Sequence, residues 1–157
     1  MGFEWASPLV MGMVLPVCVE AQVIPYFEGK LDCDTARNTL ELSLCARHQL
    51  DSLEQALETL VAQQVHELDS MIEFGRWHVM ASDEGDEQRL QDEALEADSV
   101  KTALVRDQAS FKAYLNDHTS FVFELNKSGT GRTLLANEAG IRLVRERLAL
   151  LRETFLE

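Results

Sequence analysis

The stretch CDTARNTLELSLCARHQLDSLEQALETLVAQQVHEL, residues 33–68, holds two cysteines and the beginning of a long helical pattern. Asn38 stands three residues before Glu41, which is the capping-box signature of a helix N-terminus. From there, mostly apolar residues recur at spacings of mainly three and four: Leu40, Leu44, Leu50, Leu53, Leu57, Leu60, Gln64 and Leu68. This period predicts a long amphipathic helix that begins at Asn38.

The two cysteines of this stretch, Cys33 and Cys45, are either two unrelated thiols or a disulfide. Inside one straight helix their Cα atoms would stand roughly 18 Å apart. A disulfide requires Cα atoms within about 7 Å of each other. Because the cap at Asn38 leaves Cys33 in the coil before the helix, the chain can fold back there. We therefore expect a Cys33–Cys45 disulfide that staples the N-terminal end of the fold.

Composition and charge limit the classes of function. The chain has 157 residues, 46% of them hydrophobic and 26% charged, which fits one folded domain of ordinary size. The formal net charge is −13, so the surface should repel nucleic acid and anionic lipid headgroups and attract basic partners. Solubility alone is the other explanation of this acidity.

Residues 1–21 fit a secretory signal peptide. An apolar run ends in Val19-Glu20-Ala21, which suits a signal peptidase, although the segment contains no Lys or Arg. We expect a mature domain at residues 22–157 in the bacterial periplasm or outside the cell. Loss of Glu4 and Glu20 would reduce the net charge from −13 to −11. Lipidation of Cys18 is the alternative that would place the protein on a membrane, but Val17 does not suit a lipobox.

Two further helical segments are expected after residue 75. Residues 81–87, ASDEGDE, are predicted to form an acidic loop, and residues 126–132, NKSGTGR, a turn between helices. Between them lies the second periodic segment: Leu90, Leu95, Val100, Leu104, Gln108, Phe111 and Leu115. The run at 120–125 has β-propensity, but continuation of the helix is preferred. A last helix carries an apolar face of Ile141, Val144, Leu148 and Leu151, and a charged face of Arg142, Arg145, Arg147 and Arg152.

These segments predict an all-α fold, an antiparallel bundle of three to four helices. The four histidines are not spaced as metal ligands, and the chain has no Walker loop, dinucleotide fingerprint or catalytic-triad motif. Glu54 and Glu58 lie one helical turn apart, which is typical of a polar helix face. We expect no enzyme, no cofactor and no metal. Trp77 and His78 are either an exposed contact patch or a cap on the core.

Five short motifs together resemble the LprI-type lysozyme-inhibitor domain family, a group of small secreted bacterial helical domains. They are Cys33-x11-Cys45 with Glu41, Leu50-x-x-Leu53-x-x-x-Leu57, Gln108-x-x-Phe111, Ser128-Gly129-Thr130-Gly131 and Leu143-x-x-x-Arg147-x-x-x-Leu151. The resemblance covers residues 33–155. The chain departs from the family where Glu54 replaces Asp and Phe111 replaces Trp, and the family's second cysteine pair is missing.

The resemblance implies a non-enzymatic protein that blocks lysozyme in the bacterial envelope. Animal-type lysozymes are basic, so an acidic protein would be steered toward them. From composition and expected exposure, the steering residues are Asp83, Glu84, Asp86 and Glu87. The residues expected to contact the enzyme's cleft are Ser128, Gly129 and Thr130. The alternative is a structural or adaptor protein of the envelope that binds another partner and does not inhibit lysozyme.

Overall fold

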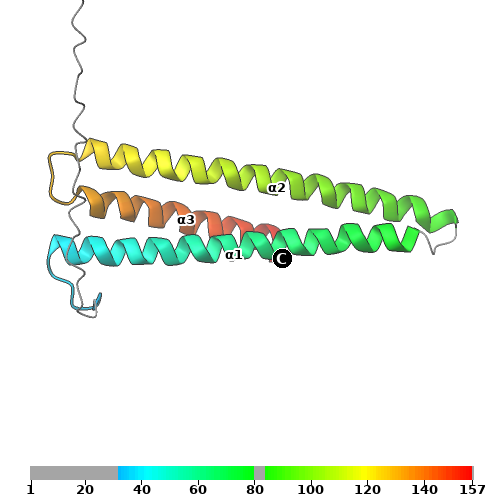
Figure 1. The fold of residues 1–157 in the computed structure, drawn as a ribbon, viewed down its shortest axis with the longest axis horizontal. Coiled ribbons are helices and arrows are strands. Elements are labelled where there is room, and N and C mark those ends of the chain that lie inside the picture. Colours follow the sequence, from blue (N-terminus) through cyan, green and yellow to red (C-terminus); the bar gives the residue numbers. More distant parts are fainter. Residues whose placement is uncertain (1–31, 80–83, 157) are drawn as a thin grey trace, which may run out of the picture. The chain divides into compact units, whose positions relative to one another are not determined.

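The computed structural model describes residues 32–79 and 84–156, and they form three packed helices (Figure 1). Helix α1 spans Thr39–Val79, α2 spans Glu84–Leu125 and α3 spans Arg132–Leu156. The chain runs along α1, returns along α2 and turns again into α3, and each helix packs on both of the others. The predicted all-α antiparallel bundle is therefore confirmed, with three helices in the described residues.

Helix α1 begins at the cap that the sequence predicts. The Glu41 N–H donates to the Asn38 side-chain oxygen at 2.9 Å, and the Leu42 N–H donates to the Asn38 carbonyl at 3.0 Å. The Glu41 carboxylate reaches one residue beyond the expected capping box and accepts the Arg37 N–H at 3.0 Å. That backbone hydrogen bond lowers the pKa of Glu41 from its ordinary value of 4.5.

The predicted disulfide joins Cys33, in the turn before α1, to Cys45 inside the helix. Their Cα atoms lie 5.6 Å apart. The turn forms because the Thr35 N–H donates to the Asp32 carbonyl at 3.3 Å, and the Asp34 N–H to the Asp32 side chain at 3.1 Å. The chain thus folds back before the cap, and the disulfide fixes this turn against the second turn of α1.

The core lies where all three helices meet. Its buried side chains include Leu50 and Leu57 of α1, Leu104 and Leu115 of α2, and Ile141, Val144, Leu148 and Leu151 of α3. The prediction for the last helix is confirmed for its apolar face. On its charged face Arg147 differs, because its side chain packs over the Phe111 ring of α2 and pairs with Asp107.

The prediction was wrong for the first leucines of α1. Leu40 and Leu44 are exposed, and the smaller Ser43 and Ala46 take the buried positions. Small side chains here let α3 approach closely, and the buried Asn137 amide of α3 donates to the Ser43 carbonyl at 3.2 Å. The small inward side chains of α1 thus lie where a buried polar group of α3 reaches the α1 backbone.

Residues 120–125 are helical, as preferred, and α2 continues to Leu125. The following turn is closed by the Gly129 N–H, which donates to the Asn126 carbonyl at 2.8 Å. The Asn126 side chain donates back to the Val122 carbonyl at 2.8 Å and so binds one of the last carbonyls of α2. The predicted turn at 126–132 is confirmed.

Helix α3 has 25 residues, whereas α1 has 41 and α2 has 42. It begins beside the start of α1 and ends near the middle of that helix (Figure 1). The contact of Gly140 with Leu50 sets this register, so the end of α3 reaches about as far as residue 66 of α1. Residues 66–79 and 84–103, which we call the two-helix arm, extend beyond α3.

Candidate functional site

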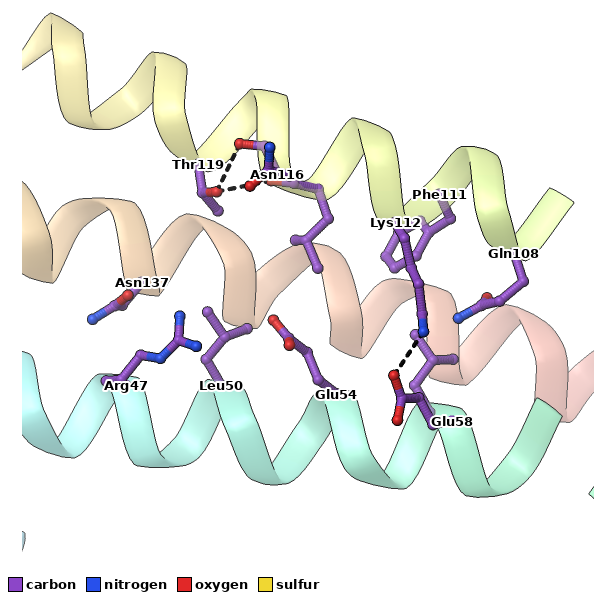
Figure 2. A pocket seen from close by; sticks show the side chains of 12 residues that line it. Arg47, Leu50, Glu54, Glu58, Gln108, Phe111, Lys112, Asn116, Thr119 and Asn137 are labelled. Carbon is purple, nitrogen blue, oxygen red and sulfur yellow. Dashed lines mark hydrogen bonds and ion pairs between the residues drawn. The ribbon is translucent and has the colours of Figure 1, made fainter. Parts of the chain in front are cut away.

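A hollow with polar and charged side chains lies between α1 and α2 beside the core, and we call it the polar groove (Figure 2). Its volume is about 390 Å³. Helix α1 contributes Arg47, Glu54 and Glu58, α2 contributes Gln108 and Lys112, and α3 adds Asn137. Apolar side chains form its floor, so charged groups stand at a rim above the core.

Two ion pairs lie at the rim. The Lys112 ammonium contacts the Glu58 carboxylate at 2.7 Å and links α2 to α1, while Arg47 pairs with Asp51 one helical turn away at 2.8 Å. All four of these side chains are about half exposed, so each pair contributes no more than about 1 kcal/mol. Glu58 therefore acts as a link between helices, and Glu54, one turn before it, is partly buried in the same groove.

Two glutamine side chains are buried between the helices, and one of them, Gln108, lines the polar groove. Gln108 is 7% exposed, and neither polar atom of its side chain has a hydrogen-bond partner among the described residues. The Gln64 side-chain nitrogen is in the same situation. Both glutamines were expected on the apolar faces, and both are buried. Buried polar groups of this kind favour one helix register over others, and a water molecule could satisfy them.

The predicted acidic loop is corrected by the structure. Helix α2 begins at Glu84, so Glu84, Asp86 and Glu87 lie in its first turn, while Asp83 lies outside the described residues. Carboxylates in a first helical turn interact favourably with the helix dipole, which explains why the acidic run is helical. Asp86 is exposed at 3.6 Å from Arg89, and Glu87 accepts a hydrogen bond from Gln91 at 3.1 Å.

Ser128, Gly129 and Thr130 are exposed in the turn between α2 and α3. The acidic residues lie at the opposite end of α2 (Figure 1). A helix of 42 residues is roughly 60 Å long, about twice the diameter of a small domain. The structure therefore does not bring the two predicted contact regions together, and one small partner cannot touch both of them at once.

Sequence reasoning missed a set of exposed apolar side chains on the two-helix arm. They are Met71, Phe74 and Trp77 of α1, with Leu95 and Val100 of α2. Leu95 and Val100 were expected in the core, and this was wrong because α3 ends before it reaches them. Trp77 is 73% exposed, which fits an exposed contact patch and rules out a cap on the core. The available signal was the spacing of Leu68, Met71 and Phe74, which continues the helical period.

Residues 32–79 and 84–156 contain neither a candidate metal site nor a candidate membrane span. In these ranges no group of three or more His, Cys, Asp or Glu side chains could hold a metal ion. Within the same ranges, no helix is long and apolar enough to cross a membrane. The expected signal peptide at residues 1–21 and the lipidation alternative at Cys18 lie outside the described residues.

Comparison with protein-family models, curated proteins and solved structures finds no match to this chain. The resemblance to the LprI-type lysozyme-inhibitor family therefore stays a prediction that rests on the five motifs.

Proposed function

We propose that this protein is a non-enzymatic binding protein of the bacterial envelope that docks its acidic surface on a basic protein. The partner that the resemblance implies is a lysozyme, which the bound protein would inhibit by obstructing its cleft. The alternative partner is a resident protein of the envelope, to which the chain would serve as an adaptor. The lysozyme version and the adaptor version of the proposal use the same acidic surface, and they differ in the partner that this surface binds.

The observation that carries this proposal is the charge of the first half of α2. Residues 84–99 contain seven Asp or Glu residues and only one Lys or Arg, Arg89. The described side chains of this run are mostly exposed, and Arg89 is shared by the Asp86 and Glu93 carboxylates. A single arginine cannot neutralise this surface. The remaining negative potential favours encounter with a basic protein and disfavours acidic ones.

The polar groove supports a binding role more than a catalytic one. Its Lys112 and Glu58 form an ion pair that links α2 to α1, and its Arg47 pairs with Asp51 within α1. Acid–base catalysis by two carboxylates requires environments that push their pKa values apart. The turn at Ser128–Thr130 is exposed and short, and it is free to enter a cleft only if the partner lies at that end of the bundle. A partner docked on the acidic end of α2, roughly 60 Å away, would not reach this turn.

Lysis of a cell-wall suspension by a basic lysozyme, with and without the purified protein, tests the lysozyme version. The account expects protection at low ionic strength that decreases as salt is added, because screening shortens the range of charge steering. A variant with Asp86, Asp92, Glu93 and Glu96 changed to the neutral amides should protect less. Absence of protection at stoichiometric excess would reject lysozyme as the partner.

The exposed apolar side chains of the two-helix arm favour the adaptor version. Charge steering does not require Met71, Phe74 or Trp77 to face solvent, whereas a stable protein interface does use apolar and aromatic contacts. Co-purification from an envelope extract, followed by reconstitution of the purified pair, separates this version from the first. Recovery of a lysozyme as the reconstituted partner would contradict it.

A further inference from the structure

We infer that the two-helix arm binds a cationic amphipathic helix, which continues the course of α3 along the groove between α1 and α2. The inference goes beyond the proposed function, since it specifies a surface and the form of a partner and does not require that partner to be a lysozyme. The arm in question comprises residues 66–79 and 84–103, beyond the end of α3.

Helix α3 shows what this groove accepts. Its buried stripe of Val144, Leu148 and Leu151 packs between α1 and α2. At the edge of that stripe, Arg147 pairs with Asp107 of α2 and lies 5.6 Å from the centre of the Phe111 ring. Apolar residues in the groove and arginine at its acidic edge thus hold α3 in place. A helix bound farther along the same groove would also contact apolar side chains in the groove and carboxylates at its edge.

The face of α1 that contacts α3 continues into the arm. Leu50 lies against Gly140 of α3, and steps of seven residues lead from it through Leu57 and Gln64 to Met71, with Phe74 three residues farther on. Residues at this spacing share one face of a helix in a bundle. Phe74 is 56% exposed and Met71 is equally open, so the face changes from covered to uncovered where α3 ends.

The facing side of α2 also continues. Asp107 pairs with Arg147 of α3, and Val100 and Glu93 stand one and two heptads before it on the same side. Glu93 joins Ser70, Met71, Phe74 and Gly75 around a hollow of about 250 Å³. An apolar side chain of a bound helix would fill this hollow, and a basic one beside it would reach Glu93.

The charge of the two-helix arm indicates which kind of helix it would bind. The part of α2 in the arm is strongly acidic, as described above. Glu67 and Glu73 of α1 add to this charge against Arg76, whereas Asp69 is paired with Lys101 of α2. Helix α3 has five arginines and three glutamates, so the chain's own helix in this groove is basic. A second copy of the arm would place acidic surfaces against each other, which opposes self-association. The complementary occupant is therefore a helix with leucine-like residues on one face and Lys or Arg beside them.

The test uses the purified protein with its disulfide intact and a synthetic peptide of about three heptads. The peptide carries leucine at the first and fourth position of each heptad and lysine elsewhere. Binding is followed by titration calorimetry and by the helical circular dichroism gained on mixing. A peptide of the same composition in scrambled order, and one with glutamate in place of lysine, are the ligand controls.

The variant pair is Phe74→Glu and Phe121→Glu. Phe121 is 58% exposed, as open as Phe74, but it lies near the other end of α2, away from the arm. Both changes remove a phenyl ring and add one negative charge. The charge at position 74 would by itself favour a cationic peptide, so weaker binding of the Phe74 variant reports loss of the apolar contact. We expect the cationic peptide to bind the Phe121 variant as it binds the parent, and the Phe74 variant at least about tenfold more weakly.

Three results would overturn the inference. One is equal binding of the ordered and scrambled peptides, which would reduce the interaction to charge alone. Another is equal loss in the two variants. The third is a dimer of the protein in sedimentation that the Phe74 variant dissociates, since a second copy would then occupy the face. These experiments contain no lysozyme. A failed lysis assay would therefore not contradict the inference, and binding of the peptide would not show that the protein inhibits lysozyme.

Discussion

Gly75 of α1 faces Ala94 of α2 so closely that a Cβ atom at position 75 would lie 2.9 Å from the Ala94 Cβ and 3.0 Å from the Leu90 carbonyl oxygen. No side chain larger than hydrogen fits without a shift of one helix. This contact draws the two helices of the arm together where α3 does not reach, and hollows open beside it on the arm. Glycine at position 75 is thus explained by close helix packing.

Replacement of Gly75 by Ala is expected to loosen the arm. The substitution gains about 1 kcal/mol of helix propensity, but the contacts with backbone and with a short side chain cannot yield easily. We expect a net destabilisation of about 1 kcal/mol, seen as faster amide hydrogen exchange in residues 68–79 and 88–100. Gly131→Ala is the control, because a Cβ there meets nothing within 4 Å. Equal exchange in the two variants would contradict the packing explanation.

The Cys33–Cys45 disulfide is expected to stabilise the fold through the turn before α1. In the chain-entropy model a loop of this size contributes about 3 kcal/mol, which corresponds to about 10 °C in Tm for a domain of this length. Intact mass after alkylation should show two protected thiols without reductant and none with it. A melting curve that does not move on reduction would show that the bridge constrains nothing in the folded chain.

Glu41 is expected to make the stability of α1 depend on pH. The Arg37 N–H lowers the pKa of this carboxyl in the folded state below its ordinary value of 4.5. A lowered folded pKa contributes stability that is present above the unfolded pKa and is lost as pH falls through the folded one. Glu41→Gln should therefore lower the urea midpoint at neutral pH and leave it nearly unchanged in strong acid. A difference that grows as pH falls would have the wrong sign for this account.

The buried Gln108 side chain is expected to lower the free energy of unfolding. Both polar atoms of its side chain are buried, and neither has a partner among the described residues. A buried polar group without a partner is unfavourable, and an apolar residue of similar volume removes that cost. Gln108→Leu should raise the free energy of unfolding by about 1 kcal/mol. Leu115→Ala, in the core of the same helix, should lower it by about 3 kcal/mol. A fall in stability for the leucine variant would reveal a hydrogen-bond partner for the amide.

Local signals in the sequence predicted much of this fold. Asn38 and Glu41 marked the helix start because capping depends on neighbouring residues alone. That start in turn allowed the disulfide between Cys33 and Cys45. The period that includes Leu50 and Leu57 correctly identified the inner face of α1. Each of these inferences needed only a short stretch of chain.

Contacts between distant segments could not be predicted in this way. Leu40 and Leu44 follow the helical period but are exposed, because α1 turns its smaller Ser43 and Ala46 inward, where Asn137 of α3 donates to the Ser43 carbonyl. Leu95 and Val100 also follow it, and they are exposed because α3 is too short to cover them. A period identifies the apolar face of a helix, but it does not show whether another helix lies on that face. The open face of the arm was missed for this reason.

Titration of a basic lysozyme with the purified protein, in low salt and then at physiological ionic strength, tests the central claim most directly. The account predicts saturable binding that weakens at least about tenfold when ionic strength rises from about 0.01 M to 0.15 M, since the Debye length falls from about 30 Å to about 8 Å. It also predicts weaker binding when Asp86, Asp92, Glu93 and Glu96 are changed to amides. An affinity that changes neither with salt nor with these substitutions would contradict the account. Absence of binding in low salt would also contradict it.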